Sequence, residues 1–154
     1  MQIKTRIFGD VTIDDSKMIN FPNGIVGFPE LKDFALIHDA EQGNQAGIRW
    51  MQSVQEPNFA MPVIDPLVVR EDYDPRVDDE LLKVIGDGSM LVLTTITVPS
   101  DLSKMSVNLK APIVINVDTR KALQVVLEDD MPVKFFVYEI LKSRKENAAK
   151  EKKD

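Results

Sequence analysis

Short apolar stretches separated by glycine, proline, asparagine or aspartate follow one another along most of the chain. In the first stretch Ile3, Thr5 and Ile7 share one face, the period-two pattern of a half-buried strand, and Gly9-Asp10 predicts a turn before 11–13. Pro62 falls inside a later stretch, where it predicts an edge strand or a bulge because proline cannot donate a ladder hydrogen bond. The pattern predicts further strands at 18–21, 34–38, 47–51, 59–64, 90–98, 105–109, 113–117 and 123–127.

One helix is predicted in the first half of the chain. Asp74 is a suitable N-cap, Pro75 suits the first helical position, and a helical period places residues 77, 81, 82 and 85 on one face. Gly86 or Gly88 then ends the helix. Near the C-terminus, 133–141 (VKFFVYEIL) predicts a strand that runs into a helix.

These elements predict a mainly β fold: a small antiparallel, barrel-like or sandwich domain with one or two short helices. The domain spans residues 1–141, and 142–154 is expected to be a basic polar tail, either helical or disordered. The chain has 154 residues and is 44% hydrophobic, which suits one compact core. We expect the protein to be a monomer on its own.

Composition narrows the location and the chemistry. No apolar run approaches the roughly 20 residues that a membrane-spanning helix needs. The N-terminus, MQIKTRIFGD, lacks the basic-then-apolar layout of a signal peptide. Cysteine is absent, which excludes disulfides and thiol catalysis. We therefore expect a cytoplasmic protein without a membrane association.

The charges are unevenly distributed. The net charge is −6, which disfavours direct contact with a nucleic-acid backbone. Residues 71–80 (EDYDPRVDDE) hold six acids and one base, whereas 142–154 hold six bases and three acids. Each run is open to two interpretations: a solvated surface, or a charged face that meets a partner of opposite charge.

Enzymatic chemistry finds little support in the sequence. The single histidine, His38, lies in an apolar stretch, no G-x-S-x-G turn presents a serine, and a zinc site lacks ligands. Asp72 and Asp74 match two positions of a calcium loop, but Arg76 occupies the next one. The acids at 128–130 are typical of a hairpin tip. We expect no catalytic residue, no metal and no cofactor, although carboxylates with a divalent cation remain an alternative.

The stretch NGIVGFPE, residues 23–30, raises the question of phosphate binding, because glycine loops can cradle phosphates. A P-loop needs Lys and Ser or Thr after its second glycine, whereas Phe28 and Pro29 follow Gly27. A nucleotide clamp of the G-x-x-G type needs favourable charge, and no base lies nearby. The pattern instead predicts a turn in which Gly24 and Gly27 take positive φ while residues 25, 26 and 28 pack inward.

The order of these motifs resembles the FliW family of bacterial flagellar assembly factors. The resemblance covers about residues 3–130 and is carried by Phe8-Gly9, Ile19–Phe21, Gly24–Phe28, Phe34, Ile48–Ser53, Phe59–Pro66, Tyr73, Val107–Asn116 and Gln124–Leu127. It implies a regulator without enzymatic activity that binds the RNA-binding carbon storage regulator CsrA and relieves its repression of flagellin mRNA translation. It also implies that flagellin binds the protein, so that flagellin and CsrA compete as switching partners.

The resemblance, combined with the acidic run, suggests which residues act. An acidic protein docked beside a basic RNA-binding surface repels RNA even without covering it. The candidate partner-binding residues are Glu71, Asp72, Tyr73, Asp74, Asp78 and Asp79, with Tyr73 as an anchor. Residues expected to be structural are Gly24, Gly27, Phe28, Gln52, Ser53, Asn108 and Pro112. A generic β-domain that binds other ligands is a further alternative.

Overall fold

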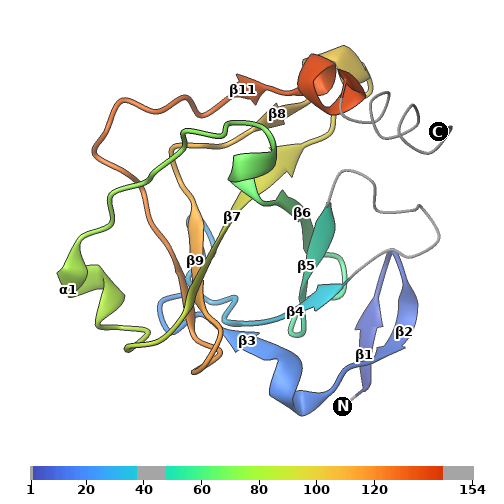
Figure 1. The fold of residues 1–154 in the computed structure, drawn as a ribbon. Coiled ribbons are helices and arrows are strands. Elements are labelled where there is room, and N and C mark those ends of the chain that lie inside the picture. Colours follow the sequence, from blue (N-terminus) through green and yellow to red (C-terminus); the bar gives the residue numbers. More distant parts are fainter. Residues whose placement is uncertain (1, 38–47, 144–154) are drawn as a thin grey trace, which may run out of the picture.

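The computed structural model describes residues 2–37 and 48–143, so the expectations for His38 and for 144–154 lie outside the described residues. Within the described residues, the chain forms a mainly antiparallel β structure with the short helix α1, several 3-10 turns and helical residues at 138–143 (Figure 1). The strands are β1 (Gln2–Thr5), β2 (Gly9–Thr12), β3 (Met18–Asn20), β4 (Asp33–Ile37), β5 (Arg49–Ser53), β6 (Ala60–Ile64), β7 (Met90–Thr97), β8 (Ser106–Val107), β9 (Ile113–Asn116), β10 (Ala122–Gln124) and β11 (Phe135–Phe136). The mainly β prediction is confirmed.

The main sheet has the order β10-β9-β7-β6-β5-β4-β3, and every neighbouring pair is antiparallel. β8 pairs with both β7 and β11, while β1 and β2 form a separate hairpin. An isolated parallel bridge joins Asn20, at the end of β3, to Lys121, the residue just before β10. The sheet therefore curls into a barrel-like form without closing as a continuous ladder (Figure 1).

Two hydrophobic clusters occupy the two faces of this curved sheet. The inner cluster contains Phe21, Phe34 and Met51, and the rings of Phe21 and Phe34 meet edge to face at 5.2 Å. The outer cluster lies under the connection from β6 to β7. β9 serves both clusters, since Ile113 and Val114 are buried on opposite faces, which explains its uninterrupted apolar sequence.

The helix is shorter than the sequence predicts. α1 spans Asp79–Leu82, and its N-cap is Asp78, whose side chain accepts the N–H of Glu80. The prediction of Asp74 as the cap was therefore wrong, because the chain is non-helical until Asp78, which has extended φ and ψ. Ile85 is fully buried beyond the helix, as the periodicity predicts.

Pro62 also differs from its prediction. β6 lies in the interior of the strand order, between β5 and β7, so it is no edge strand. However, β6 pairs with β7 only at Val63 and Ile64, and Pro62 pairs only with Trp50 of β5. The proline is tolerated because β7 has already diverged there and needs no donor from this position.

A turn near the N-terminus and a helical segment after β11 complete the described fold. Gly9, predicted to lie in a turn, instead begins β2 with φ of +69°, after a turn at residues 6–8. At the other end, β11 is followed by helical residues at 138–143, as the sequence predicts. Among the described residues, no helix has both the length and the apolar character needed to cross a membrane.

Candidate partner-binding surface

The acidic run lies in the connection between β6 and β7, and a buried tyrosine fixes this connection to the body of the protein. The connection starts with the 3-10 turn η2 (Pro66–Val68), which Asp65 caps by accepting the N–H of Leu67 at 2.9 Å. Tyr73 then enters the outer core at 5% exposure, and its hydroxyl donates to the carbonyl of Leu109 at 2.7 Å. Burial raises the pKa of Tyr73 to about 12, against a smaller opposing effect of Arg70.

Tyr73 therefore cannot act as the surface anchor that the sequence suggests. Its ring and its hydroxyl are both engaged inside the protein, so neither is presented to a partner. The tyrosine instead holds the flanking acids at the surface, because residues 71, 72 and 74 on either side of it are exposed.

The candidate acids are exposed, but they differ in their surroundings. Asp72 pairs with Arg70 at 3.3 Å, and Asp78 is engaged as the cap of α1. The carboxylates of Glu71, Asp74 and Asp79 form no ion pair or hydrogen bond with any residue in 2–37 or 48–143. Because an exposed ion pair contributes little stability, Asp72 can leave Arg70 at little cost to the fold. Asp72, Glu71, Asp74 and Asp79 are therefore available to a partner.

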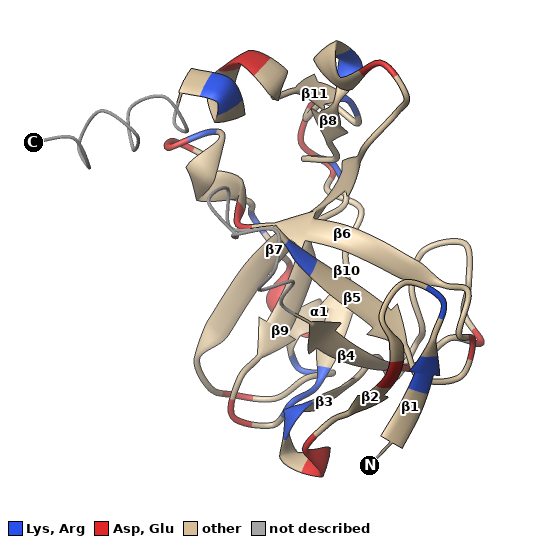
Figure 2. Cartoon of the chain, turned by 90° about the vertical axis from the view of Figure 1, so that its right-hand side faces the viewer, with Lys and Arg blue, Asp and Glu red and all other residues tan. Residues whose placement is uncertain are grey.

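Charged residues are otherwise distributed over the whole described surface. In Figure 2, acidic and basic segments occur at both the top and the bottom of the molecule. Charge alone therefore does not distinguish the acidic run from the rest of the described surface. Its distinguishing feature is the segment 125–129, which lies across a groove from it.

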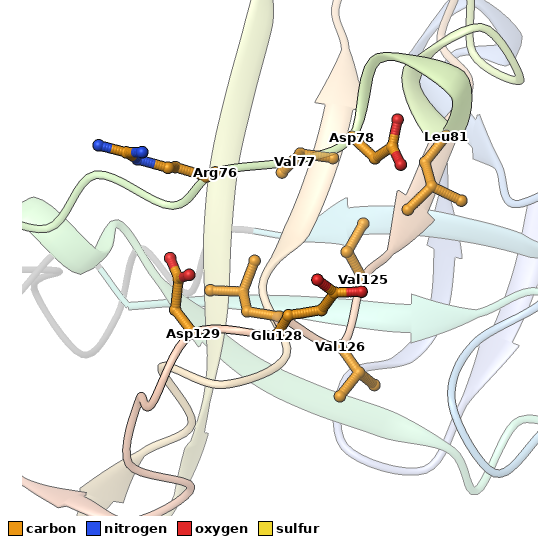
Figure 3. A pocket seen from close by; sticks show the side chains of 9 residues that line it. Arg76, Val77, Asp78, Leu81, Val125, Val126, Glu128 and Asp129 are labelled. Carbon is orange, nitrogen blue, oxygen red and sulfur yellow. The ribbon is translucent and has the colours of Figure 1, made fainter.

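A groove separates the acidic run from the chain that follows β10 (Figure 3). It encloses about 420 Å³. One wall consists of Arg76, Val77, Asp78 and Leu81, and the other consists of residues 125–129. Glu128 and Asp129 thus bring a second acidic cluster to the same groove, which holds three acids and one base. We call this the acidic groove.

The acidic groove continues into a more apolar one of about 310 Å³, and the two share Leu81, Val125 and Val126. The second groove is bounded by residues 23–26 and by Val84. Val126 is 57% exposed and Leu81 is 44% exposed, so two of the apolar side chains that both grooves share are accessible to a partner. An apolar floor with a charged rim is the arrangement found at protein interfaces.

The glycine loop, residues 23–30, lines the second groove with residues 23–26 and exposes two apolar side chains that the sequence predicts to be buried. Ile25 is buried as predicted, but Val26 is 54% exposed, and Phe28 is 42% exposed with its ring 4.9 Å from that of Phe59. The prediction that all three pack inward was therefore wrong. Gly24 and Gly27 have φ of +70° and +88°.

The remaining residues singled out in the sequence bond to nearby backbone. The side-chain amide of Gln52 donates to the carbonyls of Ser53, Pro57 and Phe59, and Ser53 Oγ accepts two N–H groups from the following turn. Asn108 Oδ1 accepts the N–H groups of residues 110 and 111. The Pro112 carbonyl accepts the N–H of residue 125. None of these four residues lines the acidic groove, although Pro112 bonds to Val125, which does.

Sequence reasoning missed the second wall of the groove. Glu128 and Asp129 are 49 or more residues from Asp79, and nothing in the local pattern shows that the two segments meet. Residues 125–128 alternate between buried and exposed positions in the structure, but their sequence, VVLE, does not alternate between apolar and polar residues and gave no signal. Within residues 2–37 and 48–143, no group of three or more His, Cys, Asp or Glu side chains is arranged to hold a metal ion.

Comparison with known proteins places this chain in a family. The family model described as "FliW protein" matches residues 2–137. The flagellar assembly factor FliW of Lachnospira eligens is 41% identical over 147 residues, covering 92% of this chain and 97% of that protein. The protein of the same name from Lachnoclostridium phytofermentans is 43% identical over 148 residues, covering 94% and 95%.

A solved structure agrees with these sequence matches. The crystal structure of a flagellar assembly factor FliW superposes with a TM-score of 0.77 at 29% identity, covering 88% of this chain and 94% of that one. The fold and the sequence thus point the same way over nearly the whole chain. This chain belongs to the FliW family.

Proposed function

We propose that this chain is a cytoplasmic, non-enzymatic flagellar assembly factor that binds a CsrA-type RNA-binding regulator and flagellin in turn. Binding of the regulator releases flagellin mRNA for translation, and newly made flagellin displaces the regulator. Membership of the FliW family supports the assembly role. The observation that carries the antagonism is the acidic groove, where two acidic clusters from distant parts of the chain face each other.

The physical mechanism is electrostatic. A regulator that holds RNA must present basic groups, and Glu71, Asp74 and Asp79 are exposed acids without partners among the described residues. Once the acidic surface docks beside these basic groups, it lowers the local potential and weakens phosphate binding. The Debye length is about 8 Å at physiological ionic strength, so the effect requires close docking.

Charge reversal tests this mechanism. The triple variant Glu71→Lys, Asp74→Lys and Asp79→Lys leaves the Asp78 cap and the Tyr73 anchor in place. Displacement of a fluorescently labelled flagellin leader RNA from the regulator is followed by anisotropy as the chain is titrated. We expect the variant to need at least about tenfold more protein than the native chain, since a tenfold change corresponds to only about 1.4 kcal/mol.

A matched control changes the same number of charges elsewhere. Asp10, Glu30 and Glu139 are also exposed, and their replacement by lysine shifts the net charge equally without touching the groove. Equal RNA displacement by the native chain and the triple variant Glu71→Lys, Asp74→Lys and Asp79→Lys refutes the electrostatic role of the acidic run. A pull-down from a flagellated cell lysate tests the wider function: recovery of neither flagellin nor the regulator rules it out for this chain.

A further inference from the structure

The chain that follows β10 leaves part of a sheet edge open. β10 is the last strand of the main sheet, and beyond Gln124 the chain continues to run alongside residues 110–112. The N–H of Val125 donates to Pro112 at 3.0 Å, and the N–H of Leu127 donates to Lys110 at 2.8 Å. Residues 125–127 thus extend the edge strand.

The backbone N–H and C=O groups of Val126 point to the side opposite those of Val125 and Leu127. Because alternate residues of a strand direct their N–H and C=O groups to opposite sides, those of Val126 face away from the sheet. Neither group hydrogen-bonds to any other residue in the described parts of the chain, and neither does the backbone of Glu128. An open edge of this kind is a template for another strand.

Among residues 2–37 and 48–143, the contacts that cover this edge lie before Val126. At β3, Asn20 bridges to Lys121, and further along the N–H of Val26 donates to the side chain of Gln124 at 2.9 Å. After Gln124 the edge opens into the acidic groove, with the Arg76–Leu81 segment as its far wall (Figure 3). The extended part of the lining, from Leu123 to Leu127, is roughly 13 Å long, at about 3.3 Å per residue.

The chemistry of the groove specifies its occupant. A partner strand paired with Val126 directs every second side chain toward the apolar floor, which Leu81 and Val126 form. Its other side chains and its end lie near Asp78, Glu128 and Asp129, which favour lysine or arginine. A second copy of this chain fits poorly, because pairing two such edges brings their acidic groups together.

We propose that the acidic groove binds an extended segment of a partner protein, rich in alternating apolar and basic residues, by β-strand addition to Val126. This mode supplies main-chain hydrogen bonds for affinity and two kinds of side-chain site for specificity. The inference deepens the proposed function. It rests on that function for one assumption, that the partner is a protein.

The test uses peptides alone, so its failure leaves the RNA-displacement result standing. The probe is a terminally blocked heptapeptide of alternating lysine and valine, and its binding is measured by NMR titration of the native chain. We expect binding, with hydrogen exchange at the Val126 amide slowed at least about tenfold at saturation. The variant Val126→Pro, which removes the outward N–H, should bind at least about tenfold more weakly, whereas Val126→Ala, which keeps the N–H and only shortens the apolar side chain, should lose less affinity than Val126→Pro.

Two control peptides separate strand pairing from simple charge attraction. One carries an N-methyl group on its central valine, which blocks a main-chain hydrogen bond at unchanged charge, and the other replaces lysine by glutamate. The proposal is overturned if the N-methylated peptide binds as tightly as the parent, or if no binding is detected at about 1 mM. A dimer of the native chain that Val126→Pro abolishes also overturns it, because the edge then pairs with itself. The exchange measurement needs no variant, so the test holds even if Val126→Pro fails to fold.

Discussion

The two glycines of the NGIVGFPE loop should respond very differently to the same substitution. Both have positive φ, +70° at Gly24 and +88° at Gly27, so alanine at either position takes a backbone conformation that L-residues disfavour. That strain costs about 1–2 kcal/mol. The space around the two positions is not the same. A Cβ at Gly24 would lie 2.4 Å from the carbonyl oxygen of Pro29 and 2.5 Å from its Cα, whereas a Cβ at Gly27 meets nothing within 4 Å.

The magnitude follows from adding the two effects. At Gly27 alanine introduces only the conformational strain, so we expect a loss of about 1–2 kcal/mol in the free energy of unfolding. At Gly24 the clash is with backbone, which cannot rotate away, and overpacking of this kind costs about 1–3 kcal/mol more. Gly24→Ala should therefore lower stability by about 2–5 kcal/mol. For a chain of this size that corresponds to a lower Tm by roughly 2–4 °C per kcal/mol.

Urea unfolding of the native chain, Gly24→Ala and Gly27→Ala measures these differences. The midpoint should fall for both variants, and more for Gly24→Ala, with the slope unchanged. For Gly27→Ala, partner binding should decline only as far as folding is lost. Equal midpoints for the two variants, or a larger loss at Gly27, would show that the close approach of Pro29 does not constrain the loop, and the reasoning would be wrong.

Two further predictions concern buried polar groups. Asn116 is fully buried and its side chain bonds to the carbonyls of Ile85, Gly86 and Asp87 and to two N–H groups, so Asn116→Ala should cost about 3 kcal/mol or more by urea unfolding. Tyr73 has a pKa raised to about 12, above its ordinary value near 10, so the folded state keeps a proton that the unfolded state loses and stability should fall as pH rises from 10 to 12. Tyr73→Phe should remove that part of the pH dependence, and an unchanged dependence in the variant would contradict this.

Much of the fold could be predicted because its signals are local. The largely apolar run at 90–98 contains the long strand β7, whose centre is buried, and the run at 113–117 contains β9, which is buried on both faces. The errors arose where contacts between distant residues outweighed local preference. The helix begins at Asp79, four residues after the Pro75 that the capping pattern favoured, in a connection that Tyr73 ties to Leu109. Pro62 sits inside the sheet because its neighbour β7 diverges there.

By itself, the sequence determined the strands, the tight glycine turns, the exposed acids and the likeness to the FliW family, because each depends on neighbouring residues or on a fixed order of motifs. Only the tertiary structure decided that Tyr73 is an internal anchor and that Glu128 and Asp129 face the acidic run across a groove. It also decided that the backbone of Val126 is open at the sheet edge. These features depend on which segments pack together, and that packing minimises exposed apolar surface over the whole chain, so no local pattern encodes it.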